Sequence, residues 1–155
     1  MKEIPLTRGL VALVDDESFD ELSQFKWYAV SPGRHLNYAY RAGSQGTAPE
    51  AMHRRLLPDA AYIDHRNGNG LDNRRSNLRP ATHQQNMFNR RMRKDNTSGL
   101  IGVQWDARRN RWRARVKVNG TTLNFGRFKD PIEAALARDA AARELHGDFA
   151  KLNFP

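Results

Sequence analysis

Asp64, His65, Asn77 and Asn86 are the residues of this sequence whose types and order suit chemistry. Hydrolysis of a phosphodiester bond requires an activated water, charge stabilisation on the phosphate and help for the departing oxygen. A histidine that is neutral near pH 7 can take the proton from water, which makes His65 the candidate base. A hard divalent cation held by a carboxylate and an amide oxygen can meet the other two requirements, so Asp64 and Asn86 are the candidate ligands.

Two short strands and a helix are predicted to position these side chains. In order, the predicted elements are a strand at 61–64, a loop at 67–70, a strand at 78–81 and a helix from 82 to about 91. The helix begins at Thr82, because Gln85 lies at the capping-box spacing, and Asn86 on its first turns can face Asp64. Adjacent strand residues point to opposite faces, so we expect the backbone to leave regular strand geometry near His65 if both residues serve one site.

Each candidate residue also has an ordinary structural interpretation. An Asp-His pair at the end of a strand is usually a turn with a solvated pair, and a single asparagine commonly caps a turn or lies exposed on a helix. His53 can be a packed core histidine, and His83 an exposed residue of a first helical turn. The ordered set, and not any one member, favours a nuclease.

This set belongs to a longer motif. Its parts are Met52-His53-Arg54, Ile63-Asp64-His65-Arg66-Asn67-Gly68, Leu71-Asp72-Asn73-Arg74, Ser76-Asn77-Leu78-Arg79 and Thr82-His83-Gln84-Gln85-Asn86. Residues 52–89 therefore resemble the HNH endonuclease family, in the form found in phage and intron-encoded homing enzymes. Residues 1–40 also resemble the scaffold that precedes the motif in such phage proteins.

The resemblance implies a role for each residue of the motif. His65 would be the general base, and Asp64 and Asn86 would hold one Mg²⁺ or Mn²⁺ against the scissile phosphate and the leaving oxygen. Asn77 would orient His65 or fix its loop. Asn86 stands where some members have histidine, which favours a hard, oxygen-preferring ion over zinc. Further candidates for phosphate contact or for support of the site are His53, Arg54 and His83.

The clearest secondary structure in the sequence is a strand at 111–118, in which apolar and basic residues alternate. The dipeptide Asn119-Gly120 is a strong signal for a hairpin turn into a return strand at 122–125, and residues 100–105 would supply a third strand. A capped helix at 130–146 follows. The basic face of the strand is either a solvated charged surface or an antiparallel ribbon that enters the major groove of DNA.

A second group of residues covers the C-terminal segment. It comprises Ser98-Gly99, Gly102-Val103, Trp112, Ala114, Phe125-Gly126, Phe128, Glu133-Ala134-Ala135, Asp139, Ala141-Ala142 and Gly147 to Pro155. Through these, residues 98–155 resemble the DNA-binding domain of plant ethylene-response factors, which implies a three-stranded sheet that reads the major groove and is backed by one helix. The DNA-binding residues implied are Gln104, Arg108, Arg113, Arg115, Lys117, Thr122 and Asn124. Ile101, Gln104 and Asn124 depart from the plant pattern, so we expect the docking mode to carry over and the DNA sequence read to differ.

Together these features predict an α+β protein of two domains. Residues 1–92 would form the nuclease domain, with a scaffold at 1–50 and a ββα-metal motif at 51–92. A basic linker at 93–97 would join it to the DNA-binding domain at 98–155, a three-stranded antiparallel sheet packed on one helix. Other predicted elements are strands at 10–14, 27–30 and 38–40 and helices at 18–25 and 52–57.

The composition favours a polyanionic partner. The 155 residues carry 26 Lys and Arg against 17 Asp and Glu, a net charge of +9, and neutralising phosphates releases counterions that drive association. The chain has no cysteine, no apolar N-terminal region typical of a signal peptide and no apolar run long enough to span a bilayer. We therefore expect a phage-encoded protein of the host cytoplasm that does not associate with membranes, and we favour a monomer.

The leading hypothesis is a metal-dependent HNH endonuclease of the homing type that cuts double-stranded DNA. One alternative is a DNA-binding regulator with an inactive HNH fold, which the intact set of Asp64, His65, Asn77 and Asn86 disfavours. Another is an RNA nuclease. The predicted sheet disfavours it, because side chains cannot easily read the deep, narrow major groove of A-form RNA.

Overall fold

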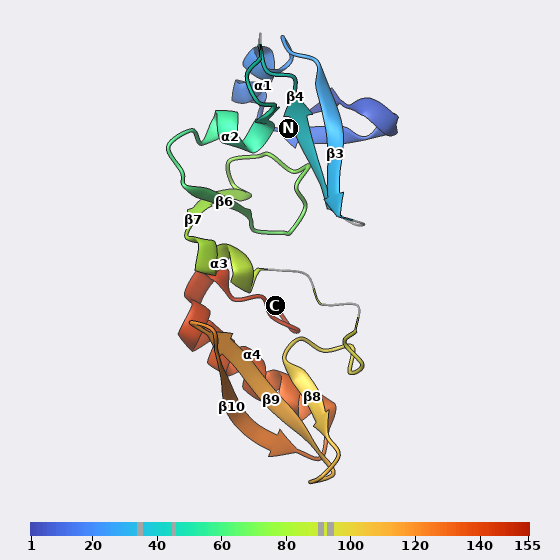
Figure 1. The fold of residues 1–155 in the computed structure, drawn as a ribbon, viewed down its shortest axis with the longest axis vertical. Helices are drawn as coiled ribbons and strands as arrows, with labels where there is room; N and C mark the ends of the chain where they lie inside the picture. Colours follow the sequence, from blue (N-terminus) through green and yellow to red (C-terminus); the bar gives the residue numbers. More distant parts are fainter. Residues whose placement is uncertain (34–35, 45, 90–91, 93–94) are drawn as a thin grey trace. The chain divides into compact units, whose positions relative to one another are not determined.

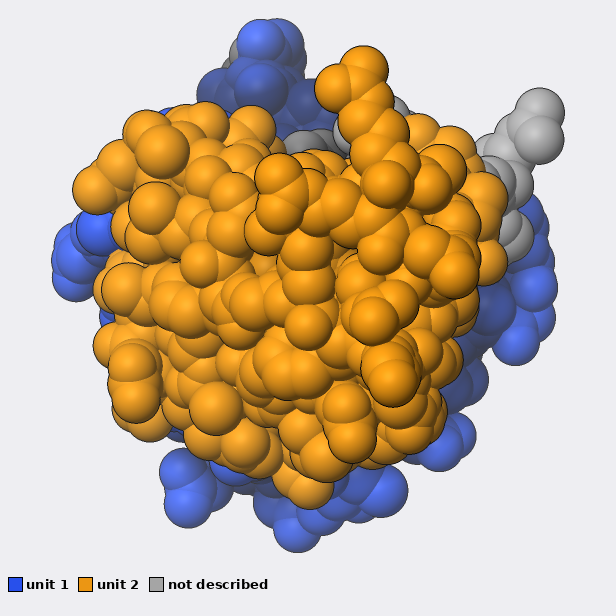
Figure 2. Space-filling model, turned by 90° about the horizontal axis from the view of Figure 1, so that it is seen from below, with its two compact units in different colours: residues 1–83 blue, residues 84–155 orange. Residues whose placement is uncertain are grey.

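The protein has mixed α and β structure, as the sequence predicts (Figure 1). The computed structural model describes residues 1–33, 36–44, 46–89, 92 and 95–155. They divide into two compact units, 1–83 and 84–155, which Figure 2 colours separately and each of which has its own hydrophobic core. Residues 93 and 94 of the predicted linker lie outside the described residues.

The first unit consists of short strands and helices joined by turns. Its elements are β1 (Lys2–Pro5), the 3₁₀ helix η1 (Thr7–Gly9), β2 (Val11–Val14), α1 (Asp16–Leu22), β3 (Trp27–Gly33), β4 (Leu36–Arg41), β5 (Glu50–Ala51), α2 (Met52–Leu56), β6 (Tyr62–His65) and β7 (Leu78–Ala81). Strand β1 pairs with β2, β4 with both β3 and β5, and β6 with β7, all antiparallel. The β6–β7 hairpin carries the candidate catalytic residues.

One hydrophobic core holds the first unit together. Side chains alternate along β1 and β2, so Ile4, Ala12 and Val14 are buried while their strand neighbours are more exposed. Leu22 of α1 is also buried, and its carbonyl accepts a hydrogen bond from Trp27 Nε1 at 2.7 Å. Further core residues are Leu6, Ala29, Ala39, Met52, Leu56, Ile63, Leu71 and Leu78. The β6–β7 hairpin therefore shares the core of the scaffold.

The loop between β6 and β7 is bonded to β2 and to the turn after it. The Leu13 amide donates to the Leu71 carbonyl and the Asn73 amide donates to the Leu13 carbonyl, each at 2.8 Å. The Arg75 amide donates to Oδ2 of Asp15 at 2.7 Å. These bonds supply partners for backbone groups that no strand or helix of the loop satisfies.

Strand β6 keeps regular pairing through His65. In its antiparallel ladder with β7, Asp64 lies opposite Arg79 and His65 lies opposite Leu78. The chain turns at Arg66, directly after His65, so the backbone leaves strand geometry near His65, as expected, but not at Asp64 or His65 themselves. Asp64 and His65 consequently point to opposite faces of the hairpin and meet different neighbours.

The second unit contains a three-stranded sheet with one long helix on it. Its elements are α3 (His83–Phe88), whose first residue closes the first unit, β8 (Val103–Asp106), β9 (Arg111–Val118), β10 (Thr121–Phe128), α4 (Pro131–His146) and the 3₁₀ helix η2 (Gly147–Phe149). The antiparallel order is β10-β9-β8, and Figure 1 shows α4 lying along one face. Small side chains permit this close contact: Ala114 and Val116 of β9 cluster with Ala134, Ala135, Ala141 and Ala142 of α4.

Two helices differ from their predicted ranges. A helix is predicted at 18–25, but α1 begins at Asp16, since Asp15 is the extended residue before it. Helix α3 ends at Phe88, and residue 91, its predicted end, lies outside the described residues. Strand β1 is not among the predicted elements, because four residues are too few to show alternation.

The strands of the second unit also shift. Strand β8 begins three residues later than predicted, and β10, predicted at 122–125, continues to Phe128. Between Asn124 and Arg127 the register of β10 changes, and Gly126 there has a φ of 118°. That conformation favours glycine, and it allows the strand to bend and remain paired with β9 at both ends.

Asp139 joins the C-terminal tail to α4. It is 1% exposed, and its carboxylate accepts hydrogen bonds from the amides of Asn153, at 2.6 Å, and Phe154, at 2.9 Å. Arg138 donates to the other carboxylate oxygen at 2.9 Å. The Asn153 side chain in turn bonds to both backbone groups of Ile101, at 2.6 and 3.1 Å. Helix, tail and the segment before β8 are therefore connected through one buried carboxylate.

Helix α3 contacts the rest of the second unit through aromatic and polar side chains. The Phe88 ring stacks on His146 of α4, with centroids 3.6 Å apart and planes inclined by 8°. Gln84 donates to the Asn119 side chain in the β9–β10 turn. The last helix of the predicted nuclease motif thus lies within the second compact unit, while the predicted domain limits at 92 and 98 stay a prediction.

We expect Asp139→Ala to lower the free energy of unfolding by about 3–5 kcal/mol, because it leaves the buried Arg138 guanidinium without its carboxylate. Urea unfolding of the full chain measures this. Asp130→Ala is the control: it removes the N-cap bond to the Ile132 amide, at 2.8 Å, and should cost about 1 kcal/mol. Equal costs for the two substitutions would contradict the role given to Asp139.

Candidate active site

Asp64 is buried and ion-paired within the β6–β7 hairpin. Its side chain is 4% exposed, and Oδ2 accepts hydrogen bonds from Arg79 Nη2 at 2.6 Å and Nε at 2.8 Å. Because Arg79 lies opposite Asp64 in the ladder, the register of the two strands creates the pair. A buried carboxylate requires such a partner, since an unpaired charge is costly to remove from water. Arg79 is not among the residues predicted for the site, although the pairing of the two predicted strands places it there.

His65 belongs to a group of three rings. Its imidazole lies edge-on to that of His53, with centroids 5.2 Å apart, and the Tyr38 ring lies 5.6 Å from His53 and 5.7 Å from His65. Tyr38 comes from β4 and His53 from α2, so a strand of the predicted scaffold and the first helix of the predicted motif position His65. The sequence predicts His53 as a supporting residue but not Tyr38, whose only signal is its place on a predicted strand.

Burial makes both histidines harder to protonate. Burial is the main cause that lowers the pKa of His53 to about 4. It also lowers the pKa of His65, although the neighbouring Asn73, Asp64 and Asp72 oppose that shift. His65 is therefore neutral near pH 7, the protonation state that a general base requires.

Asn77 fixes the loop that follows His65. It is 6% exposed; its Nδ2 donates to the Asp72 carbonyl at 2.7 Å, and its Oδ1 accepts from the Asn67 amide at 3.0 Å. Its backbone carbonyl accepts from the Arg66 amide at 2.9 Å. Of the two roles considered for Asn77, these bonds fit the one in which it holds the loop.

Asp72 and Asn73 are part of the motif, but no role is predicted for either. Both are 1% exposed. The Asp72 carboxylate accepts hydrogen bonds from Arg74, at 2.6 and 2.7 Å, and from Asn67, at 2.8 Å, and the Arg74 bond is the main cause that lowers its pKa. The Asn73 side chain favours the protonated form of His65. Their only signal in the sequence is their place in the polar loop.

The other predicted residues of the nuclease site lie on helices. His83 begins α3, and its ring lies 5.3 Å from that of Tyr62. Asn86 follows on the same helix and is half-buried within the second unit. Arg54 is exposed on α2 and donates hydrogen bonds to the loop after that helix. Thus Asp64, His65 and Asn77 belong to one hairpin of the first unit, whereas Asn86 belongs to the second unit.

The candidate metal donors of the motif are oxygen atoms, the donor type that hard cations prefer. Within the described residues, there is no group of three or more His, Cys, Asp and Glu side chains that could hold a metal ion. Mg²⁺ needs only one or two carboxylates, since water and substrate phosphate complete its shell. Asp64 offers a carboxylate whose bonds to Arg79 both involve Oδ2, and Asn86 offers an amide oxygen.

The face of the β8–β10 sheet away from α4 carries the predicted DNA-binding residues. Cross-strand register pairs Gln104 with Arg113, Arg115 with Asn124, and Lys117 with Thr122. Arg108 lies in the β8–β9 turn. These residues therefore form rows across the sheet, with arginine or lysine in each row.

Arg113 and Arg115 differ in their surroundings. Arg113 Nη2 donates to Gln104 Oε1 at 3.1 Å. Burial, and then the charge of Arg113, lower the pKa of Arg115. A third arginine, Arg127, was not predicted for this face; it pairs with Asp106 at 3.1 Å. Arg127 lies opposite Arg113 only because β10 continues past the predicted end of the strand.

Comparisons with known proteins point to one family. A sequence model described as HNH endonuclease matches residues 50–88. Protein 3.8 of Escherichia phage T7 is 41% identical over 127 residues, which are 82% of this chain and 95% of the phage protein. An uncharacterized HNH endonuclease, L560, of Acanthamoeba polyphaga mimivirus is 31% identical over 154 residues, which are 94% of this chain and 76% of the viral protein. The chain belongs to the HNH endonuclease family.

The segment that matches the HNH endonuclease model contains Asp64, His65, Asn77 and Asn86. Both viral relatives match more than the first unit, so the similarity extends into residues 84–155. No solved structure matches the chain. The likeness of residues 98–155 to ethylene-response factors stays a prediction. No helix in the described part of the chain is long and apolar enough to cross a membrane.

Acid should destabilise the first unit of this HNH endonuclease through His53. Its pKa in the folded protein is about 4, below the usual 6.5, so the unfolded chain binds the proton more readily. The free energy of unfolding is therefore unaffected by His53 protonation above pH 6.5, and it decreases by on the order of 1–3 kcal/mol as the pH falls toward 4. His53→Phe should reduce this loss in urea unfolding at a series of pH values. His83→Gln, at the exposed start of α3, should keep the wild-type dependence; an unchanged dependence in His53→Phe would contradict the assignment.

Proposed function

We propose that this HNH endonuclease hydrolyses phosphodiester bonds of double-stranded DNA with a bound divalent cation. The observation that carries the proposal is His65, a buried neutral histidine that follows a buried carboxylate, Asp64, within the segment matched to the family. The net charge of +9 favours a nucleic-acid substrate. We further propose a phage-encoded enzyme of the homing type that acts as a monomer in the host cytoplasm.

In the proposed reaction, His65 is the general base. It takes a proton from the water that attacks phosphorus, and the 3′ oxygen leaves. Tyr38 and His53 pack against its ring and limit its rotation. Asn77 is proposed to support His65 through the backbone, since its hydrogen bonds hold the loop that begins directly after His65.

Asp64 and Asn86 are the proposed ligands of Mg²⁺ or Mn²⁺. A bound ion of this kind supplies charge stabilisation for the phosphate and for the leaving oxygen. The two hydrogen bonds from Arg79 to Oδ2 fix the orientation of the Asp64 carboxylate. His53, Arg54 and His83 are proposed to support the site or contact phosphate.

The second unit is proposed to bind duplex DNA through the open face of its sheet, in the manner of the ethylene-response-factor domain. Arginine can pair with guanine, and glutamine or asparagine with adenine, in the major groove. The proposed contacts are Gln104, Arg108, Arg113, Arg115, Lys117, Thr122 and Asn124. A nuclease joined to such a unit is held at high effective concentration near its target.

A DNA-binding regulator without nuclease activity is the second candidate. The observation in its favour is the Asp64–Arg79 ion pair, because an arginine already compensates the charge of the proposed metal ligand. The two candidates share DNA binding and differ only in cleavage.

The protein should nick or linearise plasmid DNA in Mg²⁺ and should stop cutting in EDTA. His65→Ala should lower the cleavage rate by about 10²–10⁴-fold, because it removes the proton acceptor, while DNA binding persists. His35→Ala, at a histidine without a predicted role, is the matched control and should cleave as the wild type does. Rapid cleavage by His65→Ala would exclude His65 as the base, and tight binding with no cleavage by the wild type would favour the regulator.

Replacing both Arg113 and Arg115 by glutamine should weaken DNA binding and reduce the slope of log K against log salt by about 2, because about one counterion fewer is displaced for each positive charge removed at the DNA surface. Fluorescence anisotropy at several salt concentrations measures the slope. Arg143→Gln, on α4, removes an exposed charge away from this face and should change the slope little. Equal slopes for the double variant and the wild type would place the DNA elsewhere.

A further inference from the structure

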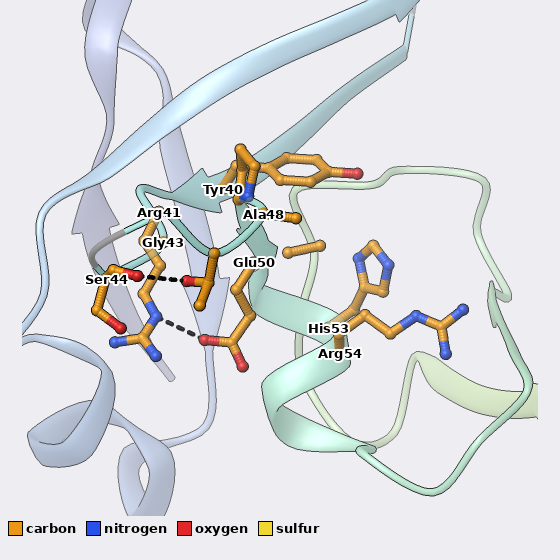
Figure 3. A pocket seen from close by; sticks show the side chains of 11 residues that line it. Tyr40, Arg41, Gly43, Ser44, Ala48, Glu50, His53 and Arg54 are labelled. Carbon is orange, nitrogen blue, oxygen red and sulfur yellow. Dashed lines mark hydrogen bonds and ion pairs between the residues drawn. The ribbon is translucent and has the colours of Figure 1, made fainter.

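A cavity of about 640 Å³ lies beside His53 in the first unit. The end of β4, parts of the β4–β5 connection, β5 and the start of α2 surround it. Figure 3 shows Tyr40, Glu50, His53 and Arg54 on its walls. Its volume is within the range of sites that hold small organic groups.

His53 connects the cavity to the candidate base. It lines the cavity, and its ring lies edge-on against His65 with centroids 5.2 Å apart. A DNA strand advances by about 3.4 Å along the helix axis for each nucleotide. If the scissile phosphate lies at His65, the strand therefore reaches His53 and the cavity within one or two nucleotides in that direction.

Arg54 places a fixed positive charge at the same cavity. Its guanidinium donates hydrogen bonds to the carbonyls of Ala60 and of Ala61, the latter at 2.8 Å, and an arginine has further N–H groups to offer. A side chain held in this way loses less entropy when it binds a phosphate. The next residue, Arg55, forms an ion pair within the protein, with its Nε 2.8 Å from Glu21 Oε1.

The acidic side chain among the described lining residues is already paired. Glu50 Oε2 lies 2.5 Å from Arg41 Nε and 3.7 Å from Arg55 Nη1. Figure 3 shows the Arg41–Glu50 pair on the opposite side of the cavity from Arg54. The wall next to His53 is therefore positive, which suits an anionic group and disfavours a cation.

The surroundings of His53 indicate which of its ring nitrogens carries the proton. Its Nδ1 is buried and has no hydrogen-bond partner among the described residues. With a pKa of about 4 the ring is neutral at pH 7 and carries one proton. Because a buried N–H without an acceptor is rarer than a buried acceptor without a donor, that proton belongs on Nε2.

We propose that this cavity is a subsite for the DNA backbone next to the scissile phosphate, in which Arg54 and His53 Nε2 bind one flanking phosphate group. His53 would then contact both the bound strand and the His65 ring. The proposal rests on the proposed nuclease function.

The first test compares Arg54→Gln with Lys26→Gln in the full chain. Arg54→Gln should raise KM for DNA cleavage about 10-fold, the loss expected for one charge-assisted hydrogen bond, with kcat changed by less than about 2-fold. It should also reduce the salt slope of kcat/KM by about 1. Lys26→Gln removes another exposed charge of the same unit and should leave both quantities near wild type.

A second variant fills the cavity without removing a charge. Ala48 is exposed on the cavity wall, so Ala48→Phe adds a ring there without disturbing the core. It should raise KM by a similar factor, with an unchanged thermal unfolding midpoint.

Neutral methylphosphonate linkages, which replace single phosphates of the DNA, then identify the phosphate that the subsite binds. They are introduced one at a time beside a mapped cleavage site in an oligonucleotide. At one flanking position the wild type should lose about 10-fold in kcat/KM, whereas Arg54→Gln should lose nothing further. Sensitivity of both proteins at every position would overturn the subsite.

The two proposals fail in different ways. If Arg54→Gln and Ala48→Phe cleave like the wild type while His65→Ala is inactive, the subsite is wrong and the nuclease function stands. If the wild type does not cleave DNA in Mg²⁺, the nuclease function is wrong and the subsite falls with it.

Discussion

Residues 66–77 must keep one conformation for the candidate site to exist. This segment contains no strand or helix, so its backbone groups need partners from elsewhere. Asn67, Asp72 and Asn77 supply some of them from within the segment, and Leu13 of β2 supplies others from outside. Because Asp72 and Asn77 are buried and bonded within the segment, the loss of either side chain leaves its partners without a hydrogen bond. The abundance of aspartate and asparagine in the motif therefore follows from folding as well as from chemistry.

The two adjacent residues of β6 illustrate two ways to bury a titratable group. His65 faces rings from β4 and α2, and in that environment it stays neutral. Asp64 faces the neighbouring strand, where Arg79 compensates its charge. Regular strand geometry produces this difference, because it directs consecutive side chains to opposite faces. The backbone leaves strand geometry only at Arg66, after both residues.

Local patterns in the sequence predict those parts of the fold that depend on local structure. Eight alternating residues reveal β9, and Asp130 with Pro131 marks the start of α4. The ordered motif predicts Asp64 and His65 as site residues, and their roles stay predictions. The partners of these two residues are harder to predict, because Tyr38 reaches His65 only through packing of the scaffold and Arg79 reaches Asp64 only through strand register. The metal ligands and the DNA contacts depend on bound groups and stay predictions.

Helix α3 limits how this protein can be divided. Its sequence belongs to the motif matched to HNH endonucleases, yet its Phe88 ring stacks on His146 of α4. A fragment that ends at residue 92 would leave that ring without its partner and expose an aromatic surface to water, which favours self-association. Transfer of the second unit to another enzyme meets the same difficulty. Residues 84–88 belong to the matched motif and also to the second compact unit. Exchange of the two units between related enzymes is therefore expected to succeed only when the helix and the surface beneath it are exchanged together.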